Sequence, residues 1–379
     1  MEKRYLFTPG PTPVPPEVLA AMAEPIVHHR GPDFRLVYER CLSRLQEVFR
    51  TRSQVLLFAA SGTGAMDSAV SNLTTPGQRV AVVTAGAFGE RWVAICERYG
   101  LDVQRIAYEW GETPVPDEVG STVAESGARI VFCTQSETST GVVSDVQALK
   151  AAVGDAVLVV DGISSLGAVP LETDAWGIDV VLSGSQKALM CPPGLAMASV
   201  ADHLWESLPP SRTFYFDWRA TRKAQDAFDA AFTPAVSLIR GLDVALGLLL
   251  GAGLDAAFER HVRLGRATRA GLKAMGLELF SPDDDSSSVV TVARCPDGID
   301  GNELLRHLRD KHGVTLAPGQ GGLKGKIFRI GHIGWFDAFD IAAALAAVEL
   351  SLVELGADID RGVAVTRAFE AYEQRVSVA

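Results

Sequence analysis

Short apolar runs alternate with helix-like segments along the chain from residue 54 onward. Four of these runs, at 79–83, 130–134, 156–160 and 179–183, show little alternation of apolar and polar positions. Such runs are typical of strands whose two faces are both covered. The segments between them repeat apolar residues at helical spacing and carry Gly or Ser at their ends. This alternation predicts an α/β fold with a mainly parallel sheet flanked by helices.

The pattern changes after a long helical stretch at residues 236–276. Shorter predicted strands at 289–293, 315–317 and 327–330 surround a helix at 302–311, and a last helix follows at 338–355. We therefore predict a large α/β domain at residues 16–255 and a smaller α+β domain at 256–379. The proline-rich residues 1–15 are expected to lie extended across the surface between the two domains.

The composition is that of an ordinary globular chain, with 47% hydrophobic and 21% charged residues in 379. The net charge of −11 does not favour binding to nucleic acid or to an anionic membrane surface. No apolar run is long enough for a bilayer span and no signal-peptide core is present, so we expect a cytoplasmic protein. The five cysteines are scattered, and no Cys or His spacing indicates a metal site.

Three polar stretches follow predicted strands, where an open parallel sheet places its ligand site. The Ser-Gly-Thr-Gly turn at 61–64 enters a helix, whose free N–H groups attract phosphate. Asp161 ends one apolar strand, and Lys187 follows another after a tight turn. Asp67 occupies the third glycine position of a dinucleotide fingerprint, and no GK[ST] motif is present. The common nucleotide-binding motifs are therefore excluded.

A phosphate-binding turn, a carboxylate and an amine are the three groups that pyridoxal phosphate needs, for its phosphate, ring nitrogen and aldehyde. The chain between Asp161 and Lys187 is long enough for one crossover and the next strand, so both side chains can face one cleft. Taken singly, each residue has an ordinary alternative. A strand-end carboxylate can pair with a structural cation, and a lysine behind a strand is usually solvated.

Three stretches, "SGTGAMDSA", "VDGISSLG" and "SGSQKAL" followed by "PPG", resemble the signatures of class V aminotransferases, which are fold-type I pyridoxal phosphate enzymes. The resemblance is closest to the alanine–glyoxylate, serine–glyoxylate and serine–pyruvate aminotransferases and extends from "TPGPTPVPPEV" to "KIFRIGHIG". It implies transfer of the amino group of a small L-amino acid, alanine or serine, to a 2-oxo acid such as glyoxylate or pyruvate. It also implies a homodimer, because such sites lie at a subunit boundary.

The resemblance also assigns roles to single residues. Lys187 would form the internal aldimine and then shuttle a proton, since an amine can act as nucleophile and as base. Asp161 would keep the pyridine nitrogen protonated, and Arg329 would grip the substrate carboxylate with its guanidinium fork. The other matches are Ser61, Gly62, Thr63 and Gln186 for the phosphate, Phe88 and Thr138 for the cofactor ring, and Gly10 for the substrate pocket.

One position departs from the family pattern. Members often carry a tyrosine shortly before a Thr-Pro pair, and this tyrosine reaches the phosphate from the partner subunit. Residues 226–232 contain no tyrosine. Thr233 is then the remaining candidate for that cross-subunit contact.

Other functions remain open at this point. A cysteine desulfurase or lyase of the same fold needs a mobile nucleophilic cysteine, and only Cys295 lies in a loop-like stretch. A serine hydrolase of the SxxK type would need a serine where Gly184 stands. A non-catalytic protein on this fold would be expected to lose Lys187 or to gain a DNA-binding module. The sequence does not identify the amino donor, the acceptor, or any assembly beyond a dimer.

Overall fold

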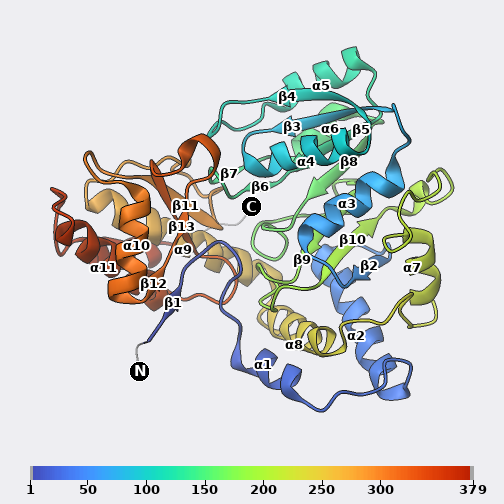
Figure 1. Ribbon diagram of the computed structural model, residues 1–379, viewed down its shortest axis with the longest axis horizontal. Coiled ribbons are helices and arrows are strands. Elements are labelled where there is room, and N and C mark those ends of the chain that lie inside the picture. The colour runs from blue at the N-terminus through green and yellow to red at the C-terminus, as the bar shows by residue number, and fades with distance from the viewer. Residues whose placement is uncertain (1–2, 376–379) are drawn as a thin grey trace.

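A seven-stranded sheet forms the centre of the larger lobe (Figure 1). The computed structural model describes residues 3–375. Only β10 runs antiparallel to its neighbours, β2 and β9, so the predicted mainly parallel α/β sheet is confirmed. In spatial order the strands are β2 (Val55–Phe58), β10 (Ala196–Val200), β9 (Val180–Gly184), β8 (Val157–Asp161), β5 (Ile130–Thr134), β3 (Arg79–Thr84) and β4 (Asp102–Ala107).

Each face of this sheet carries its own layer of helices. Alternate strand residues point to opposite faces, so that Leu158 and Val160 of β8 contact one layer and Val159 contacts the other. Because both faces are buried, the strands read as unbroken apolar runs. One layer contains α1 (Pro16–Ala23), α2 (Pro32–Phe49), α5 (Pro116–Ser126), α6 (Val146–Val153) and α8 (Val236–Ala252), and the other contains α3 (Gly62–Leu73), α4 (Ala87–Arg98) and α7 (Trp218–Gln225).

The smaller lobe has its own antiparallel sheet and its own apolar core. Its sheet has the order β11 (Val290–Arg294), β14 (Ile327–Gly331), β13 (Ala317–Pro318), and its helices are α9 (Leu254–Ala274), α10 (Gly301–His312), α11 (Ala338–Glu354) and α12 (Ala364–Tyr372). Within residues 3–375, no single helix has the length and apolarity to cross a membrane. Only α8 and α9 taken together reach that length, and they are bent by 86°.

The N-terminal segment runs between the two lobes (Figure 1). Its strand β1 (Tyr5–Leu6) pairs in parallel with β12 (Val314–Thr315) of the smaller lobe. Thr12 then donates its backbone N–H to the carbonyl of Gln186, 3.3 Å away in the larger lobe. Phe7 and Thr12 are buried, so part of this segment lies deeper than the surface path expected from its prolines.

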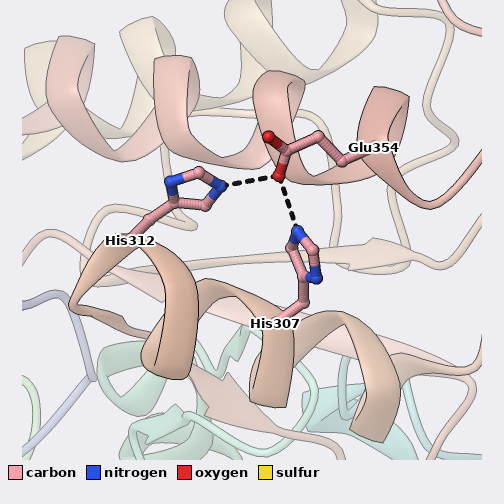
Figure 2. A group of neighbouring side chains, drawn as sticks. All are labelled: His307, His312 and Glu354. Carbon is pink, nitrogen blue, oxygen red and sulfur yellow. Dashed lines mark hydrogen bonds and ion pairs between the residues drawn. The ribbon is translucent and has the colours of Figure 1, made fainter.

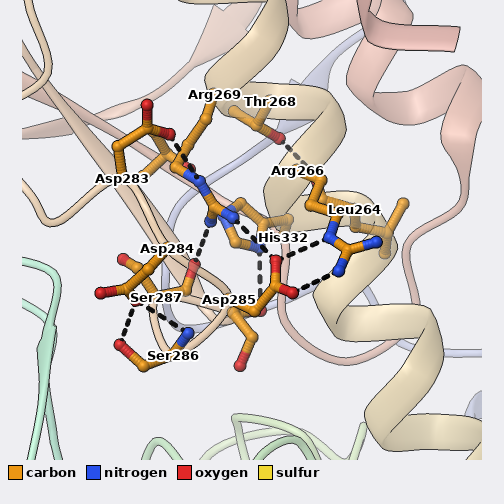
Figure 3. Close-up of polar contacts among 12 residues, drawn as sticks. Leu264, Arg266, Thr268, Arg269, Asp283, Asp284, Asp285, Ser286, Ser287 and His332 are labelled. Carbon is orange, nitrogen blue, oxygen red and sulfur yellow. Dashed lines mark hydrogen bonds and ion pairs between the residues drawn. The ribbon is translucent and has the colours of Figure 1, made fainter. Parts of the chain in front are cut away.

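A buried arginine anchors the loop between α9 and β11 (Figure 3). Arg269 donates to the carbonyl of Ser287 at 2.9 Å and forms ion pairs with Asp283 at 3.3 Å and Asp285 at 3.4 Å. The Ser287 hydroxyl donates to the carbonyl of Gly141 at 2.7 Å. Gly141 lies in the larger lobe, in the hairpin between β6 (Ser136–Glu137) and β7 (Val142–Val143). The loop therefore joins the two lobes beside the turn that contains Thr138.

Candidate active site

Lys187 lies in the turn after β9 with its side chain only 8% exposed. Its Nζ donates to the carbonyl oxygen of Pro9 at 2.7 Å. Gly10 packs directly against this amine, where a Cβ would overlap Nζ, and its φ of +142° favours glycine. Burial lowers the pKa of Lys187 to about 8, although the nearby Asp161 carboxylate opposes the shift. An amine with this pKa can serve both as a nucleophile and as a base near neutral pH.

Asp161 ends β8, the strand next to β9, and is 3% exposed. Its Oδ1 accepts the backbone N–H of Ile163 at 2.9 Å, while Oδ2 makes no hydrogen bond within residues 3–375. The pKa of Asp161 is raised to about 6, chiefly by burial and also by the charge of Glu137, while the hydrogen bond from Ile163 and the charge of Lys187 oppose the shift. The free Oδ2 of this buried carboxylate can therefore accept a hydrogen bond from a cationic group.

The turn before α3 has the features of a phosphate site. Ser61 occupies the N-cap position but makes no capping hydrogen bond, so the N–H groups of Gly62 and Thr63 remain outside the helical ladder. Gly62 is required by space, since a Cβ there would lie 2.5 Å from the Ile163 side chain. The buried Oε1 of Gln186 has no hydrogen-bond partner among the described residues. Its Nε2 makes no hydrogen bond with the described residues either, which leaves an amide donor for a ligand.

Two side chains from the start of α4 border this turn. Phe88 is half-buried, and the guanidinium carbon of Arg91 lies 4.7 Å from the centre of its ring. Nη1 of Arg91 donates to the Thr63 hydroxyl at 3.0 Å. Arg91 thus brings a positive charge to the predicted phosphate turn. Sequence reasoning missed it, because an arginine in the first turns of a helix carries no local mark of a ligand.

Glu137 is a second residue that the sequence did not reveal. Its carboxylate is 2% exposed and accepts four hydrogen bonds. Oε2 accepts the backbone N–H groups of Phe88 at 2.9 Å and Gly89 at 3.0 Å, and Oε1 accepts the N–H and hydroxyl of Ser139 at 3.2 and 2.5 Å. Burial raises the pKa of Glu137, and these hydrogen bonds oppose that shift. Glu137 therefore fixes the start of α4, and with it Phe88, relative to the loop after β5.

Arg329 reaches the cleft from β14 of the smaller lobe and is 4% exposed. Its Nε donates to the carbonyl of Pro318 at 2.9 Å and its Nη1 donates to the carbonyl of Thr138 at 2.7 Å. Nη2 makes no hydrogen bond with the described residues, which leaves one edge of the fork for a ligand. Burial lowers the pKa of Arg329 to about 10, with Glu137 opposing the shift, so the guanidinium stays charged at neutral pH.

The structure brings most of the predicted residues close together. Lys187, Asp161 and Gln186 meet residues 61–63 at the carboxyl ends of β9, β8 and β2, and the smaller lobe adds Arg329. Gly10 packs against Lys187. Thr138 contacts Arg329 through its backbone carbonyl, which accepts from Nη1.

Thr233 does not join this group. It is exposed and lines a different cavity of the larger lobe, together with Tyr215 and Leu57. Phe232, its neighbour, stacks on Tyr215 with ring centres 5.1 Å apart. The role predicted for Thr233 depends on a second subunit and stays a prediction.

A buried lysine and aspartate at neighbouring strand ends, beside a phosphate turn, define a fold-type I pyridoxal phosphate enzyme. The model of the family "Aminotransferase class-V" matches residues 4–325, and the chain belongs to this family. The predicted family membership is therefore confirmed. The family implies pyridoxal phosphate, and the free N–H groups at 62–63, the unpaired Gln186 amide and the open Oδ2 of Asp161 fit that cofactor.

The curated relatives carry several names. The chain is 40% identical to "Soluble hydrogenase, small subunit" from Synechococcus sp. (strain PCC 6716), over 94% of each chain. It is 36% identical to the L-aspartate–glyoxylate aminotransferase of Paracoccus denitrificans, over 99% of this chain and 97% of the relative. It is 33% identical to the serine–glyoxylate aminotransferase of Methylorubrum extorquens, over 97% and 95%.

A solved structure agrees with the fold over almost the whole length. The ureidoglycine–glyoxylate aminotransferase from Bacillus subtilis superposes with a TM-score of 0.93 at 30% identity, covering 99% of both chains. The chain is thus an aminotransferase of pyridoxal phosphate fold type I.

Proposed function

We propose that this enzyme moves the amino group of a small L-amino acid to glyoxylate. The observation that carries the proposal is the buried amine of Lys187 beside Asp161, with the open edge of Arg329 at the same cleft. Glyoxylate is the acceptor in the names of two of the relatives and of the solved structure described above. Pyruvate is the second acceptor to be tested.

Among donors, serine and alanine fit better than aspartate. Of the two arginines that are buried within residues 3–375, Arg269 lies on α9 and binds the loop between α9 and β11, whereas Arg329 faces the side of Lys187 and Asp161. A single buried guanidinium pairs with one carboxylate, which is the α-carboxylate of every donor. A second carboxylate on the donor side chain would then lack a buried cation. Aspartate, the donor of one relative, is therefore the informative competitor.

Each side chain has a defined task in this proposal. Pyridoxal phosphate, when bound, supplies the electron sink that lets the substrate carbon lose a proton. Asp161 holds a proton on the ring nitrogen, and the N–H groups at residues 62–63 hold the phosphate. The Lys187 amine, with its pKa near 8, would take the proton from the substrate Cα and deliver it to the carbon of the cofactor that carried the aldehyde. Arg329 orients the substrate by its carboxylate.

A visible spectrum of the purified enzyme tests the proposal. Addition of L-serine or L-alanine should remove the absorption band of the bound cofactor, and glyoxylate should restore it, whereas 2-oxoglutarate should not. The Lys187→Ala variant should lose about 10²- to 10⁴-fold in turnover, the range of general acid–base catalysis. Wild-type turnover by Lys187→Ala would contradict the mechanism. Restoration by 2-oxoglutarate alone would contradict the acceptor.

We also propose that the enzyme is a homodimer in the cytoplasm. Several large apolar side chains are exposed on α1, α2, α8 and the α1–α2 loop: Leu19, Ile26, Leu36 and Leu248. Because α1 and α2 both pack against α8, these exposed side chains lie on or between neighbouring helices, and exposed apolar side chains that gather in this way are typical of a protein interface. Light scattering on the eluted protein should give twice the chain mass. The location in the cell rests on the sequence alone.

The desulfurase alternative is disfavoured by the environment of its only candidate cysteine. Burial raises the pKa of Cys295 to about 11, so the group is a neutral thiol at physiological pH. A thiol in that state is a weak nucleophile. The hydrogenase name of one relative is likewise not supported by a cluster of cysteine ligands among the described residues. Within residues 3–375, the group of side chains placed to hold a metal contains no cysteine.

A further inference from the structure

A compact group of polar side chains joins α10 to α11 on the smaller lobe, outside the cleft (Figure 2). His307 and His312 both project from α10, and Glu354 is the last residue of α11. Nε2 of His307 lies 2.6 Å from Oε2 of Glu354, and Nε2 of His312 lies 2.8 Å from the same oxygen. Two imidazoles and one carboxylate oxygen thus converge on a single point.

We propose that this group binds one Zn²⁺ ion, with His307, His312 and Glu354 as ligands. Two histidines and a carboxylate form a ligand set that zinc uses in proteins, with water completing the tetrahedron. The three donor atoms lie within 4.8 Å of one another. Zinc bonds of about 2.0–2.1 Å set neighbouring ligands about 3.3 Å apart in a tetrahedron. The two N···O distances of 2.6 and 2.8 Å therefore need to lengthen by less than about 1 Å to admit the ion.

The backbone around the group also favours a cation. His312 ends α10 and Glu354 ends α11, so the carbonyl ends of two helices lie at the same place. Each helix end carries a partial negative charge from the peptide dipoles. The three side chains are only 17–25% exposed, which limits their freedom before the ion binds.

One residue opposes the ion and provides an internal test. Lys311 places its Nζ 2.8 Å from Oε1, the other oxygen of Glu354. Its charge repels a metal ion and competes for the same carboxylate. Removing that amine should therefore strengthen zinc binding. A cluster that served only as a hydrogen-bonded ion pair would show no such gain.

Zinc at this point would link two helices of the smaller lobe. α10 packs against α11 and also against the sheet that holds Arg329. A metal bound only by the folded protein stabilises the fold by an amount that grows with the logarithm of the ratio of free metal concentration to Kd. We expect a structural clamp, with transamination rates unaffected by saturating the site.

The experiment is a calorimetric titration of ZnCl₂ into cofactor-loaded enzyme that carries no affinity tag and has been treated with EDTA and desalted. We expect one equivalent per chain. His307→Ala, His312→Gln and Glu354→Gln should each weaken binding at least about tenfold, and Lys311→Ala should tighten it. His203 is a matched control, because its Nε2 lies 3.0 Å from Oδ1 of the Asp179 carboxylate, and no second histidine within residues 3–375 pairs with that carboxylate. His203→Ala should bind zinc as the wild type does.

The proposal fails if zinc binds equally well to the wild type and to the His307→Ala/His312→Gln double variant. It also fails if His203→Ala loses as much binding as His307→Ala. Thermal midpoints in EDTA separate folding damage from metal binding. Metal binding is measured by the increase in thermal midpoint on adding zinc, and the double variant should show no increase.

Discussion

Replacing Glu137 by glutamine should loosen the start of α4 while leaving the shape of the side chain almost unchanged. The carboxylate accepts hydrogen bonds from the backbone of Phe88, Gly89 and Ser139 and from the Ser139 hydroxyl. A glutamine has a single acceptor atom, and its NH₂ group can only donate. The amide oxygen can keep the two N–H groups of α4, and the NH₂ can donate to the Ser139 hydroxyl. The backbone N–H and the hydroxyl of Ser139 then both lose the acceptor that the carboxylate provided.

The expected cost follows from these lost acceptors. A buried N–H without a partner costs about 1–3 kcal/mol, and loss of a charge at a helix start costs up to about 2 kcal/mol. The neutral amide recovers part of this, because burial already penalises the charged carboxylate. We expect a net loss of about 2 kcal/mol in the free energy of unfolding.

Urea unfolding of the cofactor-loaded enzyme, followed by fluorescence, measures this loss. Glu97→Gln makes the same chemical change on an exposed face of the same helix, and should stay within about 0.5 kcal/mol of the wild type. Because Glu137 fixes Phe88, the variant should also hold pyridoxal phosphate more weakly. A Glu137→Gln enzyme as stable as Glu97→Gln, with unchanged cofactor affinity, would refute the role assigned to this carboxylate.

Three further predictions concern the cleft. Arg329→Lys should raise KM for the amino donor about tenfold or more with a smaller change in kcat, measured by steady-state kinetics, because a point charge replaces a bidentate fork. Gly10→Ala should lower kcat/KM by about 10²-fold, because the added Cβ displaces Lys187. Gly77 also has a positive φ but has open space around it, so Gly77→Ala should leave kcat/KM unchanged. Equal effects of the two substitutions would contradict the steric argument. In cofactor-free protein, Lys187 loses its proton near pH 8 in the folded state and near pH 10.5 in the unfolded chain. Raising the pH between these values should therefore stabilise the wild type relative to Lys187→Met by about 3 kcal/mol, measured by urea unfolding. A difference in unfolding free energy that does not change with pH would exclude the lowered pKa.

The central strands of the larger lobe are readable from sequence because both of their faces are buried. The predicted range 130–134 coincides with β5, and the prediction for β9 is offset by one residue. The edge strand β4 was not predicted, because one face is solvated and its "DVQRIA" stretch is half polar. β10 was missed as well. Its "AMASV" stretch has little intrinsic strand preference, and its antiparallel direction depends on neighbours that no local pattern reveals.

The candidate site also contains residues that the sequence predicts and residues that it does not. Lys187 and Asp161 follow apolar strands directly, so the geometry of a parallel sheet brings them together. Glu137 and Arg91 act through contacts with segments 28 to 49 residues away in the sequence. In "SETSTG" and "FGERW", nothing local distinguishes a buried carboxylate or a site-facing guanidinium from a solvated one. Such residues become visible only when the helix start and the neighbouring loop are placed in space.

The path of residues 5–12 has a consequence for how the molecule is made. Tyr5 finds its strand partner at Val314, and Thr12 contacts Gln186, so this stretch has no lasting neighbours until most of the chain exists. Contacts so distant in sequence form slowly. During translation the pocket around the essential lysine would thus stay open on one side until the final third emerges. We expect catalytic competence to appear as the closing event of folding, after both lobes have acquired their cores.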